Sequence, residues 1–102
     1  MSNFLFAYKG GSMAETAEAQ EAAMKAWMDW FGTLGSAVVD GGAPFGASTA
    51  VQAGGARGSA SAGLGGYSVI QADSLDLAAK LAEGCPVFSA GGTVEVYEAL
   101  AM

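Results

Sequence analysis

The longest helical pattern in the chain covers residues 15–34. Its apolar residues recur at every third or fourth position, which predicts an amphipathic helix with one side against a core. This stripe consists of Met13, Ala17, Met24, Trp27, Met28, Phe31 and Leu34. Gly35 follows the last of them and is typical of the residue at which a helix ends. Trp30 lies at the flank of the stripe, where the core, a ligand or a second subunit would cover it.

Four other segments are rich in branched and aromatic residues, or alternate between apolar and polar residues, as β-strands do. We expect strands at residues 3–8, 36–40, 66–72 and 93–97. Side chains point alternately to the two sides of a strand. In the first strand both sets are apolar: Phe4, Phe6 and Tyr8 on one side, Leu5 and Ala7 on the other. We therefore expect this strand at the centre of a sheet, with both of its sides covered.

A shorter helix is expected between the third and fourth strands. Either Asp73 or Ser74 can cap its first turn, and Gly84 and Pro86 end it. Its apolar side consists of Leu75, Ala78, Ala79 and Ala82.

Residues 46–63, between the second and third strands, are mostly Gly, Ala and Ser, with Arg57 as their single charge. Residues 49–53 and 56–61 would form the two strands of a hairpin whose turn is Gly54-Gly55. An irregular loop fits this composition as well, because the second of these strands contains few branched residues. Both alternatives remain open from the sequence.

The order strand–helix–strand, hairpin or loop, strand–helix–strand predicts an α+β fold. It is the order of the ferredoxin-like, split βαβ arrangement, in which two helices pack on one face of an antiparallel sheet. Two helices cover only one face, whereas the first strand is apolar on both. We therefore expect the other face to be buried against a second copy in a homodimer. A chain of 102 residues that is 52% apolar and 14% charged is expected to be a single domain, residues 1–102.

The charge of the chain bears on its partners. Ten acidic residues against four basic ones give a net charge of −6, and the basic residues are scattered, so nucleic acid is not an expected partner. No apolar run reaches the ~20 residues of a membrane span, and no basic signal segment precedes the first strand. We therefore expect a cytoplasmic protein without membrane association. Cys85 has no second cysteine to pair with and is expected to be a small core residue.

The residue types exclude several kinds of chemistry. The chain has no His, which removes the commonest general base, the usual zinc ligand and the Ser-His and Cys-His nucleophile pairs. No carboxylates have the spacing of metal ligands. The glycines of residues 63–66 precede a strand and lack the Lys and Ser/Thr of a phosphate-binding loop. We expect no metal ion and no cofactor.

The candidate catalytic residue is Asp40, at the end of the second strand and before Gly41-Gly42. A carboxylate at this position is open to a ligand, and in a pocket of aromatic side chains its pKa would rise, as a general base requires. The alternative is a solvated aspartate that accepts a hydrogen bond from its own turn.

Five further residues could line a ligand site: Tyr8, Trp27, Trp30, Arg57 and Tyr67. Each has a structural alternative. The tryptophans could belong to the core, the tyrosines could lie at the edge of the core with satisfied hydroxyls, and Arg57 could be solvated.

Several blocks of the sequence resemble the YCII-related family. They are MKAWMDWFGTLG (24–35), AVVDGGAP (37–44), LGGYSVIQADSLD (64–76), CP (85–86) and GGTVEV (91–96). The resemblance covers nearly the whole chain and implies a ferredoxin-like dimeric α+β barrel with a cleft between the first helix and the sheet. Some members carry a His–Asp pair proposed as an active site, and one branch carries an Asp-Gly-Pro-Phe motif. This chain has no His and lacks that motif in residues 56–63, and Asp40 is the position similar to an acidic cleft residue.

The first functional hypothesis is that a small organic molecule binds in this cleft, lined by Asp40, Trp30 and Tyr67. The second is a non-catalytic dimerisation or interaction module, suggested by the missing His and the Ala/Gly-rich segment. The third is a cofactor-independent monooxygenase, which would require Asn3, Trp30 or Tyr67 to converge in one cavity. Whether the chain is an enzyme is left open by the sequence.

Overall fold

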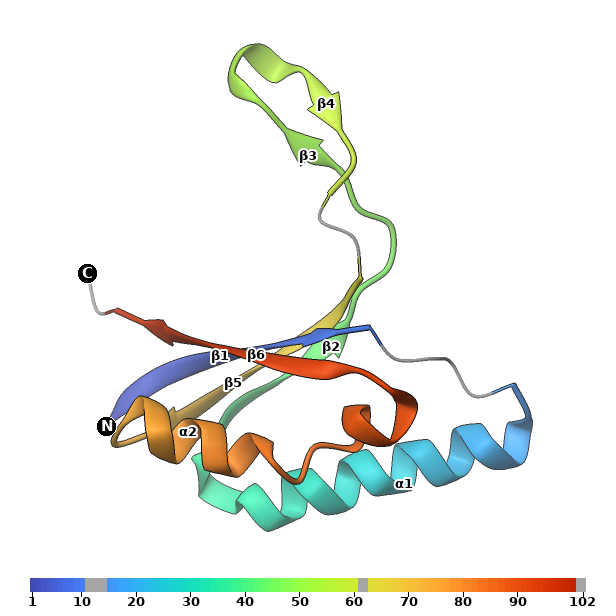
Figure 1. Ribbon diagram of the computed structural model, residues 1–102, viewed down its shortest axis with the longest axis vertical. Helices are drawn as coiled ribbons and strands as arrows, with labels where there is room; N and C mark the ends of the chain where they lie inside the picture. The colour runs from blue at the N-terminus through green and yellow to red at the C-terminus, as the bar shows by residue number, and fades with distance from the viewer. Residues whose placement is uncertain (11–14, 61–62, 101–102) are drawn as a thin grey trace.

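The computed structural model describes residues 1–10, 15–60 and 63–100 (Figure 1). Its strands and helices are β1 (Ser2–Lys9), α1 (Ala17–Leu34), β2 (Val38–Pro44), β3 (Ala50–Val51), β4 (Arg57–Gly58), β5 (Leu64–Ala72), α2 (Leu75–Ala82) and β6 (Thr93–Ala99). Three short 3₁₀ turns connect them: η1 (Gly35–Ala37), η2 (Ala53–Gly55) and η3 (Pro86–Ala90). Two expectations fall partly outside the described residues: Met13 in the helical stripe, and Ser61 at the end of the hairpin.

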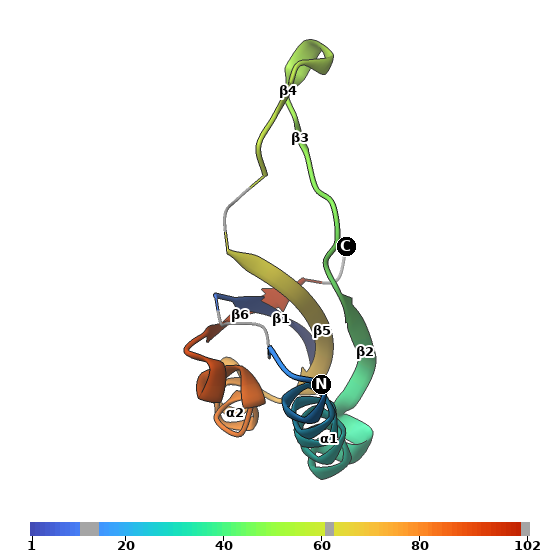
Figure 2. The ribbon, with the colours of Figure 1, turned by 90° about the vertical axis from the view of Figure 1, so that its right-hand side faces the viewer.

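The main sheet has four strands in the order β2-β5-β1-β6, and each neighbouring pair is antiparallel. Both helices lie on the same side of this sheet (Figures 1 and 2). This is the expected ferredoxin-like α+β arrangement, and β1 occupies the expected central position. Within the described residues, no helix is long and apolar enough to cross a membrane.

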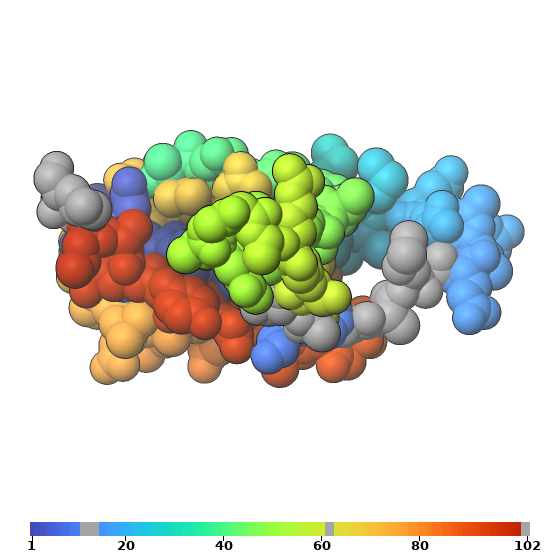
Figure 3. All heavy atoms as spheres, turned by 90° about the horizontal axis from the view of Figure 1, so that it is seen from above, coloured from blue at the N-terminus to red at the C-terminus, as the bar shows by residue number. Residues whose placement is uncertain are grey.

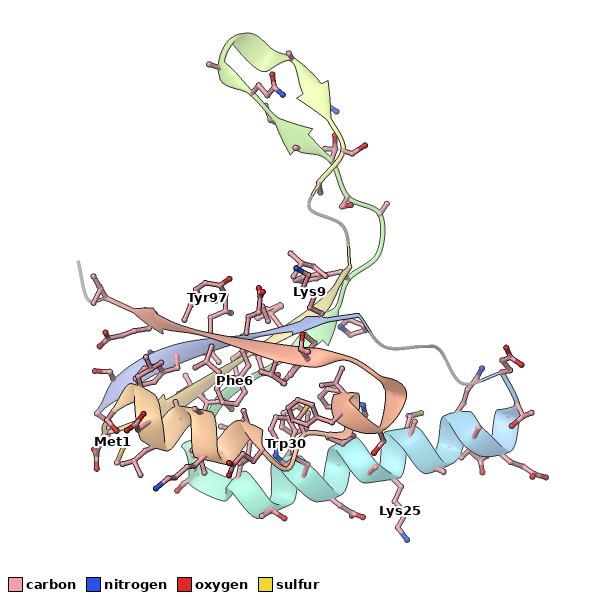
Figure 4. The ribbon with its side chains drawn as sticks, viewed as in Figure 1. Met1, Phe6, Lys9, Lys25, Trp30 and Tyr97 are labelled. Atoms are coloured by element: carbon pink, nitrogen blue, oxygen red, sulfur yellow. The ribbon has the colours of Figure 1, made fainter. Side chains whose placement is uncertain are left out.

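The strand register decides which side chains face the helices. Residues directly opposite each other in antiparallel strands lie on the same side of the sheet. Phe6 is opposite Ser68 and Val96, and these three face the helices. The other side, which we call the open side, carries Leu5, Ala7, Tyr67, Val69, Glu95 and Tyr97. Figure 4 shows the contrast, with Phe6 and Trp30 between sheet and helices and with Tyr97 and Lys9 beyond the sheet.

One core lies between the helices and the sheet. Phe4 and Phe6 of β1 are 1% and 0% exposed, and Ile70 of β5 is 0% exposed. The remaining buried members of the core are Tyr8, Trp30, Leu34, Ala72, Ala78, Ala82, Cys85 and Val87. The apolar side of the first strand predicted this core, whereas residues of the open side such as Leu5 and Val69 are only partly buried.

The stripe expected along α1 is confirmed at Trp27, Phe31 and Leu34 but wrong at Met24 and Met28. Met24 and Met28 are 65% and 70% exposed, whereas Trp30 is 6% exposed and fully part of the core. The first half of α1 extends past the sheet, so its stripe has no surface to meet (Figures 1 and 3). The side of the helix that packs runs through Trp27, Trp30 and Leu34, which share the same three-and-four spacing. The helix begins after Thr16, whose side chain accepts a hydrogen bond from the amide of Ala19 at 3.0 Å.

The apolar side expected on α2 is also partly wrong. Ala78 and Ala82 are buried, but Leu75 is 54% exposed and Ala79 is exposed. Leu81, which was not expected to face the core, packs against it instead. Compared with the expectation, α2 is therefore rotated about its axis so that Leu81, and not Leu75, faces the core. Two buried alanines allow its backbone to lie close to the sheet.

Residues 45–60 form a projection that we call the arm. Its two short strands pair at Ala50 with Gly58 and at Val51 with Arg57, so the hairpin alternative is correct over the described residues. Gly54 and Gly55 form its turn with φ values of 86° and 92°, a conformation that favours glycine. The arm rises from the ends of β2 and β5 toward the open side, away from both helices (Figures 1 and 2).

Candidate functional site

Aromatic side chains fill the space between α1 and the sheet. The ring of Tyr8 meets Trp27 edge-on, with ring centroids 4.8 Å apart. Trp30 lies 5.7 Å from Trp27, 5.2 Å from Phe31 and 6.3 Å from Phe6. Such edge-on and offset pairs contribute about 0.5–1.5 kcal/mol each beyond the area they bury. The place where the sequence predicts a cleft is therefore occupied by packed rings.

Trp30 is held on both sides. Its indole Nε1 donates a hydrogen bond to the carbonyl oxygen of Leu81 at 3.2 Å, which ties α1 to α2. Gly84 lies against the same ring, where a Cβ would come within 3.2 Å of Trp30 Cδ1. Trp30 is therefore a core residue whose ring also borders the groove described below. Trp27 is half-buried and packs against the same core.

A buried chain of hydrogen bonds links three strands. The Tyr8 hydroxyl donates to Ser68 Oγ at 2.7 Å, and Ser68 Oγ donates to the carbonyl oxygen of Gly41 at 2.8 Å. Burial raises the pKa of Tyr8 to about 12, an effect that the hydrogen bond to Ser68 only partly offsets. Tyr8 is therefore a neutral phenol at physiological pH, with its hydroxyl proton engaged inside the protein.

Asp40 lies in the irregular part of β2. It is exposed, and its Oδ1 accepts a hydrogen bond from the amide of Gly42 at 2.8 Å. Gly42 has a φ of 73°, and a Cβ at this position would overlap the carbonyl oxygen of Tyr67. This hydrogen bond is the one expected if Asp40 is a solvated aspartate that stabilises its own turn. The carboxylate stabilises a bend that only glycine can complete.

The open side carries a second group of polar and aromatic side chains. The rings of Tyr67 and Phe45 stack with centroids 5.9 Å apart and an interplanar angle of 22°. Across the sheet, the Tyr97 hydroxyl donates to Glu95 Oε1 at 2.9 Å, and the Glu95 carboxylate raises the pKa of Tyr97 through this bond. Lys9 Nζ lies 3.9 Å from Glu95 Oε2.

A short side chain lies between these two groups. Ala7 is at the centre of β1, directly opposite Tyr67 on one neighbour and Glu95 on the other. The neighbouring side chains largely cover Ala7, which is 8% exposed. The sequence shows the alternation that places Glu95 and Tyr97 on one side of their strand, but it does not show that this side faces Tyr67.

The six candidate residues of the sequence do not form one site. Tyr8, Trp27 and Trp30 lie together on the helix side of the sheet. Tyr67 faces the open side, and Arg57 is exposed on the arm. Asn3 lies opposite Gln71 on the open side, so Asn3 and Trp30 are separated by the sheet.

An open groove of about 600 Å³ runs between α1 and the segment that follows α2. Trp30, Cys85 and Phe88 contribute apolar surface to it, and Asp29 and Glu83 contribute carboxylates. Cys85 is 3% exposed, as expected for a small core residue, and burial raises its pKa to about 11. Among the described residues, no three or more His, Cys, Asp or Glu side chains come together in a way that could hold a metal ion.

Comparisons with known proteins bear on the fold and the family. Among solved structures, the chain is similar to the 5-chloro-2-hydroxyhydroquinone dehydrochlorinase TftG from Burkholderia phenoliruptrix AC1100, solved in complex with 2,5-dihydroxybenzoquinone. The TM-score is 0.61 at 18% sequence identity, and the match covers 98% of this chain and 95% of the other, which shows a shared fold. No curated protein matches the sequence significantly. The YCII-related domain matches residues 1–102, the whole chain, so this protein belongs to the YCII-related family.

Proposed function

We propose that this chain is a homodimer that binds a small, flat organic molecule between two facing sheets. The observation that carries the proposal is the open side of the sheet. Its central residues, Leu5, Ala7 and Val69, are apolar, and no helix of the described chain covers them. A sheet that is apolar on both faces is stable in water only when both faces are covered. A second copy, related by a two-fold axis, covers it with the same surface.

The short side chain of Ala7, between the larger Tyr67 and Glu95, supports a ligand in this interface. Two facing sheets pack about 10 Å apart, and side chains fill the space between them. Tyr67 and Tyr97 are long enough to span it, whereas Ala7 is not, so the two copies would enclose a flat space above Ala7. At its margin Lys9 Nζ supplies a donor and the Glu95 carboxylate an acceptor, while the Tyr97 hydroxyl already donates to Glu95. This chemistry suits a small ring that carries hydroxyl or carbonyl groups, and TftG was solved with such a molecule.

We propose binding rather than catalysis because the groups that could transfer a proton are engaged or neutral. Asp40 accepts a bond from its own turn, and the raised pKa values of Tyr8 and Cys85 keep both side chains protonated at physiological pH. The packed rings between α1 and the sheet support the same choice. An interaction module without a ligand is the second candidate, and the same packing favours it.

Sedimentation velocity across a concentration series tests the dimer. We expect the wild type to sediment as a dimer at micromolar concentration. Leu5→Glu places a charge on the open side and should shift the protein to monomer, because burying an unpaired carboxylate is strongly unfavourable. The matched control is Leu77→Glu, since Leu77 is 43% exposed on α2. A wild-type protein that stays monomeric at all concentrations would contradict the proposal.

Two matched phenylalanines test the position of the ligand. Phe45 stacks on Tyr67 at the open side and is 48% exposed, whereas Phe88 lies in the groove beside Trp30 and is 46% exposed. A panel of small hydroxylated and quinone rings is screened by thermal shift. A ligand at the open side should lose its shift in Phe45→Ala and keep it in Phe88→Ala. The reverse pattern would move the site to the groove, and the absence of any shift in the wild type would favour the interaction module.

The same screen tests Asp40. If Asp40 contributes to the ligand site, a ligand that shifts the wild type should give a different shift in Asp40→Asn. Equal shifts would limit Asp40 to its role in the turn.

A further inference from the structure

We infer that the arm, residues 45–60, is an intermolecular clasp that lies against the second copy of the chain and places Arg57 next to its carboxylates. This inference rests on the proposed homodimer. It concerns a segment that the proposed function does not otherwise use, and four observations support it.

The arm stands on the side of the sheet where the second copy is expected. It leaves the sheet at the ends of β2 and β5 and rises beyond the open side, while both helices lie on the opposite side (Figures 1 and 2). Seen from above, it stands over the sheet itself (Figure 3). A second sheet packed on the open side would therefore meet the arm.

The length of the arm exceeds the distance between two packed sheets. Residues 45–51 form its rising segment, of which Ala50–Val51 is the strand; at ~3.3 Å per residue, six steps reach at most about 20 Å. Facing sheets lie only about 10 Å apart. The turn at Gly54-Gly55 is therefore long enough to reach the level of the second sheet and to lie beside the second copy.

The arm has few internal hydrogen bonds and little apolar packing to stabilise its conformation. Its ladder consists of two residue pairs, and its remaining bonds include Gln52 N to the Ala56 carbonyl oxygen at 2.7 Å and Thr49 Oγ1 to the Gly58 carbonyl oxygen at 3.2 Å. An isolated two-stranded hairpin is marginally stable in water. Val51, its largest apolar side chain beyond Phe45, is 67% exposed. A surface that covers Val51 would supply the missing stabilisation.

The area of the sheet alone is small for a stable dimer. Four strands spaced ~4.8 Å apart and about seven residues long have a footprint of about 450 Å². Standard interfaces bury ~600–1,000 Å² per partner. The arm is the part of the described chain that extends toward the second copy and can supply the difference.

The distribution of charge favours a second copy of this chain as the partner that the arm contacts. Arg57 is the single charged residue of the arm, whereas all ten acidic residues of the chain lie outside it. A cation at the end of a projecting hairpin is attracted to the acidic surface of an identical chain. Two-fold symmetry makes this contact twice in each dimer.

The test compares two charge reversals of equal size. Arg57→Glu changes the charge of the arm, and the control Lys25→Glu changes an exposed cation on α1 that points away from the sheet (Figure 4). If each arm contributes a factor of about three through an exposed ion pair, Arg57→Glu weakens the dimer about tenfold. Lys25→Glu should weaken it less than about threefold, and the difference should shrink at high salt. Sedimentation equilibrium measures both.

Two further measurements test the contact of the arm independently of Arg57. Replacing residues 46–63 with a short Gly-Ser turn should weaken the dimer more than Arg57→Glu, provided that circular dichroism shows a folded protein. Hydrogen exchange on the wild type should show the amides of residues 50–58 protected in concentrated protein and exposed after dilution. A dimer whose dissociation constant is unchanged in Arg57→Glu, with arm amides that exchange freely at high concentration, would overturn the clasp and leave the dimer intact. A chain that never dimerises would overturn the proposed function itself.

Discussion

Replacing Gly42 with alanine should be one of the most destabilising single changes outside the core. Gly42 has a φ of 73°, and an added Cβ would overlap the Tyr67 carbonyl oxygen and lie 2.6 Å from the Tyr67 carbonyl carbon. Both are backbone atoms of the neighbouring strand, so no side chain can move aside. The edge strand β2 must separate from β5 to make room.

The size of the effect follows from what the separation breaks. The left-handed conformation costs an alanine about 1–2 kcal/mol. Displacing β2 also disturbs the bond from Ser68 Oγ to the Gly41 carbonyl oxygen and at least one neighbouring backbone pairing, at about 1 kcal/mol each. Together these give a loss of about 3–4 kcal/mol in the free energy of unfolding, a large part of the ~5–15 kcal/mol of an ordinary domain.

Gly41→Ala is the matched control. An added Cβ at Gly41 meets nothing within 4 Å, and its φ is not positive. Alanine there should change the stability by less than about 1 kcal/mol, or raise it slightly by restricting the unfolded chain. Urea unfolding followed by tryptophan fluorescence, at one fixed protein concentration, measures both variants. If the two differ by less than about 1 kcal/mol, the close approach of Gly42 to Tyr67 is not the constraint inferred here.

Three other changes test the core and the caps. The pKa of Tyr8 rises from 10.0 to about 12 on folding and that of Cys85 from 9.0 to about 11, so the unfolded chain loses these protons first. Stability should be full below pH 9 and fall as the pH rises to 12; Tyr8→Phe should remove the upper part of the fall, about 2–3 kcal/mol, and an unchanged profile in this variant would contradict the assignment. Trp30→Phe leaves the Leu81 carbonyl without its indole donor and should lower the unfolding free energy by about 2 kcal/mol in urea titrations, unless water replaces the bond without loss. Ser74→Ala removes the side chain that caps α2 and should cost about 1 kcal/mol by the same assay; no change would mean that the cap at 3.2 Å is not stabilising.

The order and type of the main elements could be predicted from the sequence because each is a local pattern. The alternation in residues 3–8 gives a strand that is apolar on both sides, and this alone places β1 at the centre. The capping Ser74 and the glycines at the turns mark where elements begin and end. These features depend on residues a few positions apart, which a sequence displays directly.

The packing side of α1 could not be predicted, because two apolar stripes overlap on that helix. The expected stripe runs through Met24, Met28 and Leu34, whereas the packed side runs through Trp27, Trp30 and Leu34, and both have helical spacing. The sheet decides between them, since it supports only the second half of the helix and there contacts the side that carries Trp30 and not the side that carries Met28. An apolar residue beyond the end of the supporting surface remains exposed whatever its periodicity.

The candidate site was the least predictable part for a related reason. Asp40, Trp30 and Tyr67 are suitable residue types, but side chains of neighbouring strands share a face only in one register. The observed register and the bulges of β2 place Tyr67 on the open side and leave Trp30 under the sheet.

The position of β1 also governs when the protein can fold during synthesis. β1 is synthesised before both of its partners in the sheet, β5 and β6, which end at Ala72 and Ala99. Its aromatic residues therefore remain unpaired and exposed during synthesis until β5 and β6 have emerged from the ribosome. Pairing of residues so distant in sequence is slow, and it leaves Phe4 and Phe6 available to chaperones in the meantime. A nascent chain released before residue 93 would lack one full neighbour of its central strand and should be degraded rather than accumulate.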